Sequence, residues 1–224
     1  MITMLETPII IVNYKTYGQS VGKRSVELTK TIEKNKKESW AVCPQTVDMR
    51  MVSEDSEVPV LAQHIDAIEP GSHTGHTLLK SVKEAGATGT LINHSEKRLK
   101  LSDIEKIVNM CKEEGLDTIV CANNPEVAAG AAALSPDFVA YEPPELIGGD
   151  ISVSTGKPEL IEEAVRKVKK VDGSVEVLCG AGVKNGDDVK KALELGTEGV
   201  LLASGLVKAD DPVKVIEDLE SGIE

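Results

Sequence analysis

The sequence predicts an α/β protein with a single (β/α)8 barrel spanning residues 1–224, and three observations support this fold class. Eight short apolar runs recur along the chain, each long enough for a strand and too short for a helix. The runs are continuously apolar, which is typical of parallel strands covered on both faces. They start at intervals of about 27 residues, the length of one strand-plus-helix unit. Such barrels typically have about 250 residues, so helices and loops are expected to be trimmed.

Each apolar run is expected to form one strand, and no linker or change of composition separates one run from the next. The strands of such a barrel are parallel, so their carboxyl ends meet at one mouth, where the catalytic groups of this fold lie. In chain order the expected strands are Ile9–Asn13, Trp40–Cys43, Val60–Gln63, Gly89–Asn93, Thr118–Ala122, Phe138–Glu142, Val175–Cys179 and Gly199–Ala203.

Polar segments with helical periodicity lie between the strands, and their ends carry recognisable signals. Ser102 and Glu105 have the spacing of a capping box, and Asp211 followed by Pro212 suits an N-cap with proline at the first helical position. Three further segments end in a glycine that suits a left-handed C-cap, namely Gly86, Gly115 and Gly196.

The charge balance and the cysteines exclude several classes of function. The chain has 25 Lys and Arg against 37 Asp and Glu, a net charge of −12, which disfavours broad binding to nucleic acid or to an anionic membrane. No apolar run approaches the length of about 20 residues that a membrane span needs. Four cysteines without a C-x-x-C pair are expected to be buried thiols, with neither a zinc site nor disulfides. We therefore expect a cytoplasmic protein.

Three strand ends carry side chains suited to catalysis. The first strand ends in Asn13 and Lys15, an amide and an ammonium that can bind an anion in a dry cleft. The fourth is followed by His94, whose imidazole can act as acid, base or electrophile, with Ser95 and Glu96 next to it. The sixth ends in Glu142, a partly desolvated carboxylate suited to work as a general base.

Two other strand ends carry small residues, which let backbone N–H groups approach an anion closely. These turns are Gly180–Gly182 after the seventh strand and Ala203–Ser204 after the eighth, where barrels of this kind often bind phosphate. The glycines lack the spacing of a dinucleotide-binding fingerprint. Between the sixth strand and the next helix, prolines and glycines in residues 143–150 suit a hinged lid.

Together these motifs resemble the triosephosphate isomerase family, and the resemblance spans nearly the whole chain. The compact length is similar to the archaeal branch of that family, whose fold is the TIM barrel. The motifs that carry it are Asn13-Tyr14-Lys15, Ala62-Gln63, Gly71–Gly75, His94-Ser95-Glu96, Ala140-Tyr141-Glu142-Pro143, Ile147-Gly148, Gly180-Ala181-Gly182 and Ala203-Ser204.

The resemblance implies roles for individual residues in isomerising a small phosphorylated triose without metal or cofactor. Asn13 and Lys15 bind substrate, His94 is the electrophile and Glu142 is the base. Ser95 and Glu96 support these side chains, and Glu96 orients Lys15. The further substrate-binding positions implied are Tyr14, Ile147, Gly148, Gly182, Ala203 and Ser204. Thr74, in the family's interface loop, reaches the neighbouring subunit's site, so self-association is expected, as a homotetramer or alternatively a homodimer.

The chain departs from the family pattern around the phosphate. Gly182 stands where serine is usual, and Ala203-Ser204 where two glycines are usual, so phosphate binding is expected to rest more on backbone amides. Asp150 is expected near the phosphate, where its negative charge is unfavourable unless the side chain points away. Two other functions on the same barrel stay open, a Schiff-base aldolase acting through Lys15 and a phosphate-ligand sensor without catalysis.

Overall fold

A computed structural model describes residues 5–143, 152, 156 and 158–223, and these residues form a closed parallel barrel. The strands pair in sequence order and β1 closes the ring against β8, so the predicted (β/α)8 barrel is confirmed. The strands are β1 (Ile9–Asn13), β2 (Ser39–Cys43), β3 (Val60–Ala62), β4 (Ala87–Ile92), β5 (Asp117–Ala122), β6 (Phe138–Tyr141), β7 (Glu176–Cys179) and β8 (Gly199–Leu202).

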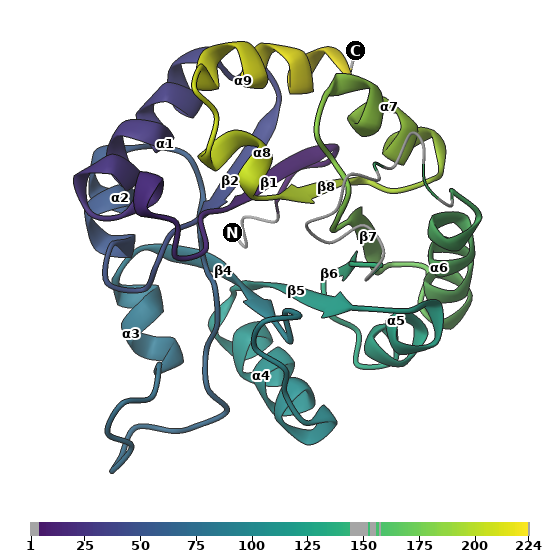
Figure 1. Cartoon of the computed structure of the whole chain (residues 1–224). Coiled ribbons are helices and arrows are strands. Elements are labelled where there is room, and N and C mark those ends of the chain that lie inside the picture. Colours follow the sequence, from purple (N-terminus) through teal and green to yellow (C-terminus); the bar gives the residue numbers. More distant parts are fainter. Residues whose placement is uncertain (1–4, 144–151, 153–155, 157, 224) are drawn as a thin grey trace.

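Helices surround the barrel, and Figure 1 shows them as an outer ring around the strands. Several are short, with 7 residues in α2 and 6 in α3, as expected for trimmed connections. The helices are η1 (Gly18–Ser20), α1 (Lys23–Asn35), α2 (Met49–Asp55), α3 (Leu79–Glu84), α4 (Leu101–Glu114), α5 (Pro125–Ala132), α6 (Pro158–Val171), α7 (Gly186–Glu194), α8 (Ser204–Val207) and α9 (Pro212–Ser221).

Most of the expected helix ends are confirmed. Gly86, Gly115 and Gly196 have φ values of 92°, 71° and 89°, the left-handed region that glycine adopts without steric cost. The Asp211 side chain caps α9 by accepting a hydrogen bond from the Lys214 backbone N–H. Each of these three glycines lies at or directly after a helix end and lets the chain turn into the next strand.

The expected capping box at Ser102 is wrong. Helix α4 begins at Leu101, one residue before the serine, and its N-cap is Lys100, which makes no capping bond with its side chain. The Lys100 carbonyl already accepts the Ile104 N–H at 3.0 Å, so the first turn closes before Ser102. Ser102 therefore has helical backbone, whereas an N-cap serine needs extended backbone.

Alternating side chains of each strand pack into two separate cores. In β1, Ile9 and Ile11 join a cluster inside the barrel, whereas Ile10 and Val12 join a larger cluster between strands and helices. Both faces of the strand are thus covered, which explains the continuous apolar runs in the sequence. Leu5 belongs to the inner cluster and covers the end of the barrel opposite the mouth.

The cysteines are free thiols, and all of them are buried, as expected. Burial raises the pKa of Cys111 and of Cys179 to about 12, so neither forms a thiolate near neutral pH. Within residues 5–143, 152, 156 and 158–223, no group of three His, Cys, Asp or Glu side chains could hold a metal ion. None of the described helices is long and apolar enough to span a membrane.

Candidate active site

One cavity of about 490 Å³ opens at the carboxyl ends of the strands. Residues that are far apart in the sequence meet there, because parallel strands end at the same mouth. The strand ends that contribute are those of β1, β4, β6, β7 and β8, which are the five positions selected from the sequence. The cavity is lined in part by Asn13, Lys15, His94, Ser95, Glu96, Glu142, Gly180, Gly182, Ala203 and Ser204.

Glu142 lies at the mouth because it continues the inward-facing series of β6. Phe138 and Ala140 belong to the inner core, and Glu142 is the next residue on that face. The side chain is only 3% exposed although it lines the cavity. A Cβ atom at Gly180 would lie 2.7 Å from Glu142 Cγ, so this glycine leaves room for the carboxylate. The arrangement gives a desolvated carboxylate that faces a ligand-sized space.

His94 contacts this carboxylate with one ring nitrogen and the backbone with the other. Its Nε2 lies 3.1 Å from Glu142 Oε1, and its Nδ1 accepts the Glu96 backbone N–H at 3.2 Å. An Nδ1 atom that accepts a hydrogen bond carries no proton, so the proton of the neutral ring is on Nε2. The Ser95 N–H also donates to Glu142 Oε2, at 3.4 Å. The imidazole therefore presents a donor toward the cavity.

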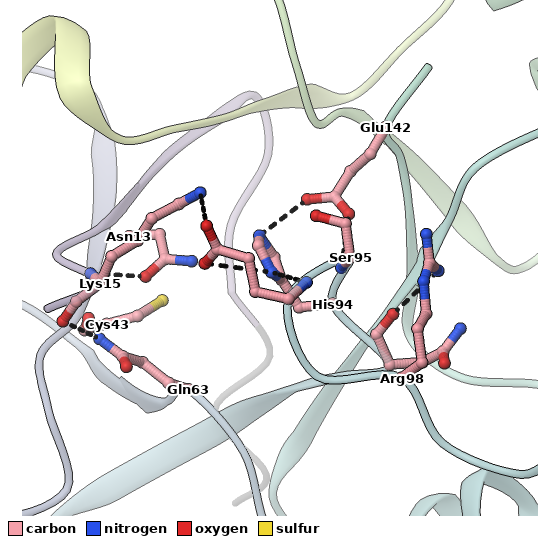
Figure 2. A network of polar contacts seen from close by, with 10 residues as sticks. Asn13, Lys15, Cys43, Gln63, His94, Ser95, Arg98 and Glu142 are labelled. Carbon is pink, nitrogen blue, oxygen red and sulfur yellow. Dashed lines mark hydrogen bonds and ion pairs between the residues drawn. The ribbon is translucent and has the colours of Figure 1, made fainter. Parts of the chain in front are cut away.

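Lys15 lies on the side of His94 opposite Glu142, and contacts to both the side chain and the backbone of Lys15 hold it there. Its ammonium pairs with Glu96 Oε1 at 3.1 Å. The backbone of Lys15 has a φ of 47°, which is uncommon for any residue other than glycine. Its carbonyl accepts a hydrogen bond from Gln63 Nε2 at 2.9 Å. The Lys15 N–H donates to Asn13 Oδ1 at 2.9 Å, so the Asn13 Nδ2 donor points away from Lys15 N. Figure 2 shows Lys15, His94 and Glu142 directed toward one another.

The remaining wall is made of small residues and backbone. Gly182 has a φ of 76°, a conformation that a substituted residue adopts only with strain, and Ala203–Ser204 lead into α8. Lys184 lines the cavity beside this turn. An anionic ligand in this cavity would therefore meet these small residues and the cations Lys15 and Lys184, in a protein whose net charge is −12.

Some expected site residues lie elsewhere. The Tyr14 side chain is buried between β1 and α1, where its hydroxyl bonds to Thr29 Oγ1 at 2.7 Å, and it does not line the cavity. Thr74 lies in an exposed loop between β3 and α3 that projects away from the barrel in Figure 1. Ile147, Gly148 and the rest of the expected lid from residue 144 to 150 lie outside the described residues.

Some residues that line the cavity were not predicted from the sequence. Tyr17 lines it, and the Lys208 ammonium lies 4.3 Å from the centre of the Tyr17 ring, which joins the first and last loops of the mouth. Lys184 follows Gly182 by two residues, so a basic residue beside an expected phosphate turn was an available signal. Nothing in the sequence around Tyr17 indicates its cation partner.

Comparison with known proteins identifies the chain's relatives. A family model described as triosephosphate isomerase matches residues 8–219. The triosephosphate isomerase of Methanocaldococcus jannaschii is 55% identical over 214 residues, 94% of this chain and 98% of the relative. That of Methanothermus fervidus is 55% identical over 218 residues, 96% of this chain and 98% of the relative. That of Methanothermobacter thermautotrophicus is 52% identical over 221 residues, 97% of this chain and 96% of the relative.

Proposed function

This chain belongs to the triosephosphate isomerase family, and we propose that it interconverts D-glyceraldehyde 3-phosphate and dihydroxyacetone phosphate, a step of glycolysis and gluconeogenesis. The observation that carries the assignment to this cavity is the pair of Glu142 and His94, 3.1 Å apart, with the Lys15 ammonium nearby. A base, a neutral donor and a cation around one cavity are the groups that proton transfer next to a carbonyl requires.

In this mechanism Glu142 removes a proton from the carbon next to the substrate carbonyl. The electrons of that C–H bond form the double bond of an enediolate, and the carbonyl oxygen gains negative charge. Glu142 then returns the proton to the neighbouring carbon, while the proton of the substrate hydroxyl passes to the former carbonyl oxygen, so that the carbonyl now stands on the carbon that lost its proton. The reaction moves protons within one molecule and consumes no electrons, so its balance needs no cofactor.

The donors around the cavity stabilise the charge that develops on the enediolate oxygens. His94 Nε2–H, now next to Glu142, would bond to a substrate oxygen instead, which frees the carboxylate to reach the carbon. Lys15 Nζ and Asn13 Nδ2 are the other donors, because the Asn13 oxygen is already used by the Lys15 N–H. Donors fixed in place before the reaction stabilise such charge effectively.

The phosphate of the substrate would lie against the backbone of Gly182, Ala203 and Ser204. Small residues there allow the amides to come close, and the neighbouring Lys184 adds a positive charge. By the same family correspondence, Ile147 and Gly148 complete this subsite. Glu96 holds Lys15 by the ion pair of 3.1 Å and holds His94 through its own backbone N–H.

The test is to incubate the purified protein with glyceraldehyde 3-phosphate, without added metal or cofactor, and to follow dihydroxyacetone phosphate through a coupled reductase. The parent should turn over rapidly, and Glu142→Gln should lose about 10²–10⁴-fold in kcat, the usual contribution of a general base. Glu113→Gln, an exposed position on α4, is the matched control. An inactive parent would refute the proposed function, and an active Glu142→Gln variant would refute the role of Glu142.

The same protein separates the isomerase from the other two functions. A Schiff-base aldolase needs a neutral lysine amine, whereas Lys15 is engaged in an ion pair with Glu96. Borohydride with substrate present should therefore leave Lys15 unmodified, and a trapped adduct would favour the aldolase. Binding of glycerol 3-phosphate by a protein that turns nothing over would favour the sensor.

We propose that the protein is cytoplasmic and self-associates, as a homotetramer with the homodimer as alternative. The loop that carries Thr74 supports the self-association, because it is exposed and is closed at its base by two hydrogen bonds between Asp66 and Thr77, of 2.9 and 2.7 Å. Light scattering should give the mass of four 23.9 kDa chains, and Thr74→Arg should reduce both that mass and kcat. A monomeric, active parent would refute the proposal.

A further inference from the structure

Asn93 occupies an unusual position at the start of the loop that carries His94. It directly follows β4, is 7% exposed and has a φ of 61°. Left-handed backbone is adopted most easily by glycine, and asparagine is the side chain that tolerates it best among the others. Backbone geometry alone therefore does not require an asparagine here, since a glycine would satisfy it.

The Asn93 side chain uses both ends of its amide. Its Nδ2 donates to the Cys121 carbonyl on β5 at 3.0 Å, and its Oδ1 accepts the Leu99 backbone N–H at 2.9 Å. The first bond joins the start of the loop to the neighbouring strand. The second joins the start of the loop to its end, just before α4. One side chain therefore closes the loop from residue 93 to residue 99 and attaches it to the barrel.

A third bond reinforces this closure from the backbone side. Arg98 Nη1 donates to the Asn93 carbonyl at 3.2 Å, a contact that Figure 2 shows on the side of His94 opposite Lys15. Within the loop, the Lys97 N–H also donates to the His94 carbonyl at 2.8 Å. The loop is thus a closed turn whose position relative to β5 depends on the amide of Asn93.

This loop supplies three contacts to the cavity. His94 Nε2 lies 3.1 Å from Glu142, the Ser95 N–H donates to Glu142, and Glu96 pairs with Lys15 at 3.1 Å. Each of these groups is within three residues of Asn93. A shift of the loop would therefore move the electrophile, the base contact and the lysine partner together.

We propose that Asn93 is a positioning residue for the isomerisation. It holds His94 in contact with Glu142 and Glu96 in contact with Lys15. The inference rests on the proposed function. Asn93 does not line the cavity, so it acts through the loop and touches no substrate. Misplacement of catalytic groups by about 1 Å can cost about 100-fold in rate, so its loss should lower kcat more than it changes KM.

The test compares Asn93→Gly with Asn93→Ala. Both variants lose the two side-chain bonds, but only alanine adds strain at a φ of 61°. Side-chain anchoring predicts that both lose about 10- to 100-fold in kcat, with a smaller change in KM. Ser135→Gly is the matched control, because Ser135 also has a positive φ, 51°, and precedes β6 at the far end of the barrel. Its kcat should equal that of the parent.

Two results would overturn the proposal. One is an Asn93→Gly variant with the kcat of the parent, which would leave Asn93 a backbone role only. The other is an unchanged ¹⁵N NMR signal of His94 Nε2 in Asn93→Gly, since a shift of the loop would change the contact of 3.1 Å between this atom and Glu142, which lies outside the loop. The NMR readout needs no turnover, so it tests Asn93 even if the parent lacks isomerase activity, a result that would refute the proposed function instead.

Discussion

Buried carboxylates occur at both ends of this barrel, but they differ in what faces them. At the mouth, Glu142 is 3% exposed, lines the cavity and contacts the His94 ring. At the opposite end, Asp117 and Glu220 are each 2% exposed and accept hydrogen bonds from backbone or indole N–H groups. Burial therefore does not distinguish the carboxylate proposed as catalytic from the structural ones. The distinguishing features of Glu142 are its contact with an imidazole ring and the adjacent cavity.

Glu220 shows how a buried carboxylate can act in the fold alone. Its Oε1 accepts the Trp40 indole N–H at 2.6 Å and the backbone N–H groups of Lys37 and Glu38 at 2.9 and 3.3 Å. These bonds tie α9, the last helix, to the start of β2. Its Oε2 is buried and accepts no hydrogen bond from any residue that the structure describes. Three donors on one oxygen hold the last helix against the segment that leads into β2.

The largest expected effect is the difference in kcat between substitutions of Glu142 and of Glu220. Glu142→Gln should lower kcat about 10²–10⁴-fold while leaving the melting temperature close to that of the parent, because its partner is a group of the cavity. Glu220→Gln should leave kcat near the parent's value, since no atom of Glu220 lines the cavity. Steady-state kinetics and calorimetry on both variants check this. Loss of activity in Glu220→Gln at a temperature where it is folded would break the comparison.

The second prediction applies the same comparison to lysines in ion pairs. Lys15 pairs with Glu96 at 3.1 Å at the mouth, and Lys169 pairs with Glu198 at 2.6 Å near the other end. Lys15→Ala should lower kcat/KM about 10²–10³-fold, the usual effect of removing one donor to a developing oxyanion. Lys169→Ala should keep the activity of the parent. Equal kcat/KM values for the two variants would contradict the role of Lys15.

The third prediction concerns stability at the far end of the barrel. Glu220→Ala leaves the Trp40 indole N–H and two backbone N–H groups without their acceptor, at about 1–3 kcal/mol for a buried donor. Each kcal/mol lowers the melting temperature by roughly 2–4 °C in a protein of this size. Glu217→Ala, exposed on the same helix, is the control and should melt like the parent. A Glu220→Ala variant as stable as Glu217→Ala would show that these bonds add nothing.

The side chains proposed as catalytic could be predicted from the sequence, because each lies within two residues of the end of an apolar strand. The carboxyl ends of parallel strands meet at one mouth of the barrel. The residue types at these strand ends therefore predicted that Lys15, His94 and Glu142 are neighbours. The eight strands were predicted for the same reason, since burial on both faces leaves a continuous apolar run.

The supporting contacts were not accessible in this way. Asn93 was expected only as the last residue of a strand, and the sequence analysis did not select Glu220, because their partners Cys121 and Trp40 lie 28 and 180 residues away. Gly180 was expected to let backbone N–H groups approach an anion, and the structure shows in addition that its missing side chain makes room for Glu142. Such roles depend on which backbone groups the folded chain brings within 3 Å, and no local pattern encodes that.

The smallest expected effect is a change in the pH dependence of stability. Burial, and then the charge of Asp137, raise the pKa of Asp117 to about 6, although the Leu5 N–H opposes this. In the unfolded chain the pKa of an aspartate is about 3.9. Between these values the folded protein binds more protons than the unfolded chain, so the free energy of unfolding falls as pH rises from about 4 to about 6.

Asp117→Asn removes this titration and keeps an oxygen that can accept the Leu5 N–H. The free energy of unfolding should therefore fall less between pH 4 and pH 7 in the variant than in the parent, as urea titrations at the two pH values would show, while kcat at pH 7 stays unchanged. Parallel pH profiles of stability for variant and parent would mean that Asp117 is charged in the fold at both pH values. A changed kcat would mean that the two ends of the barrel are coupled, and the separation between a catalytic mouth and a structural base would then fail.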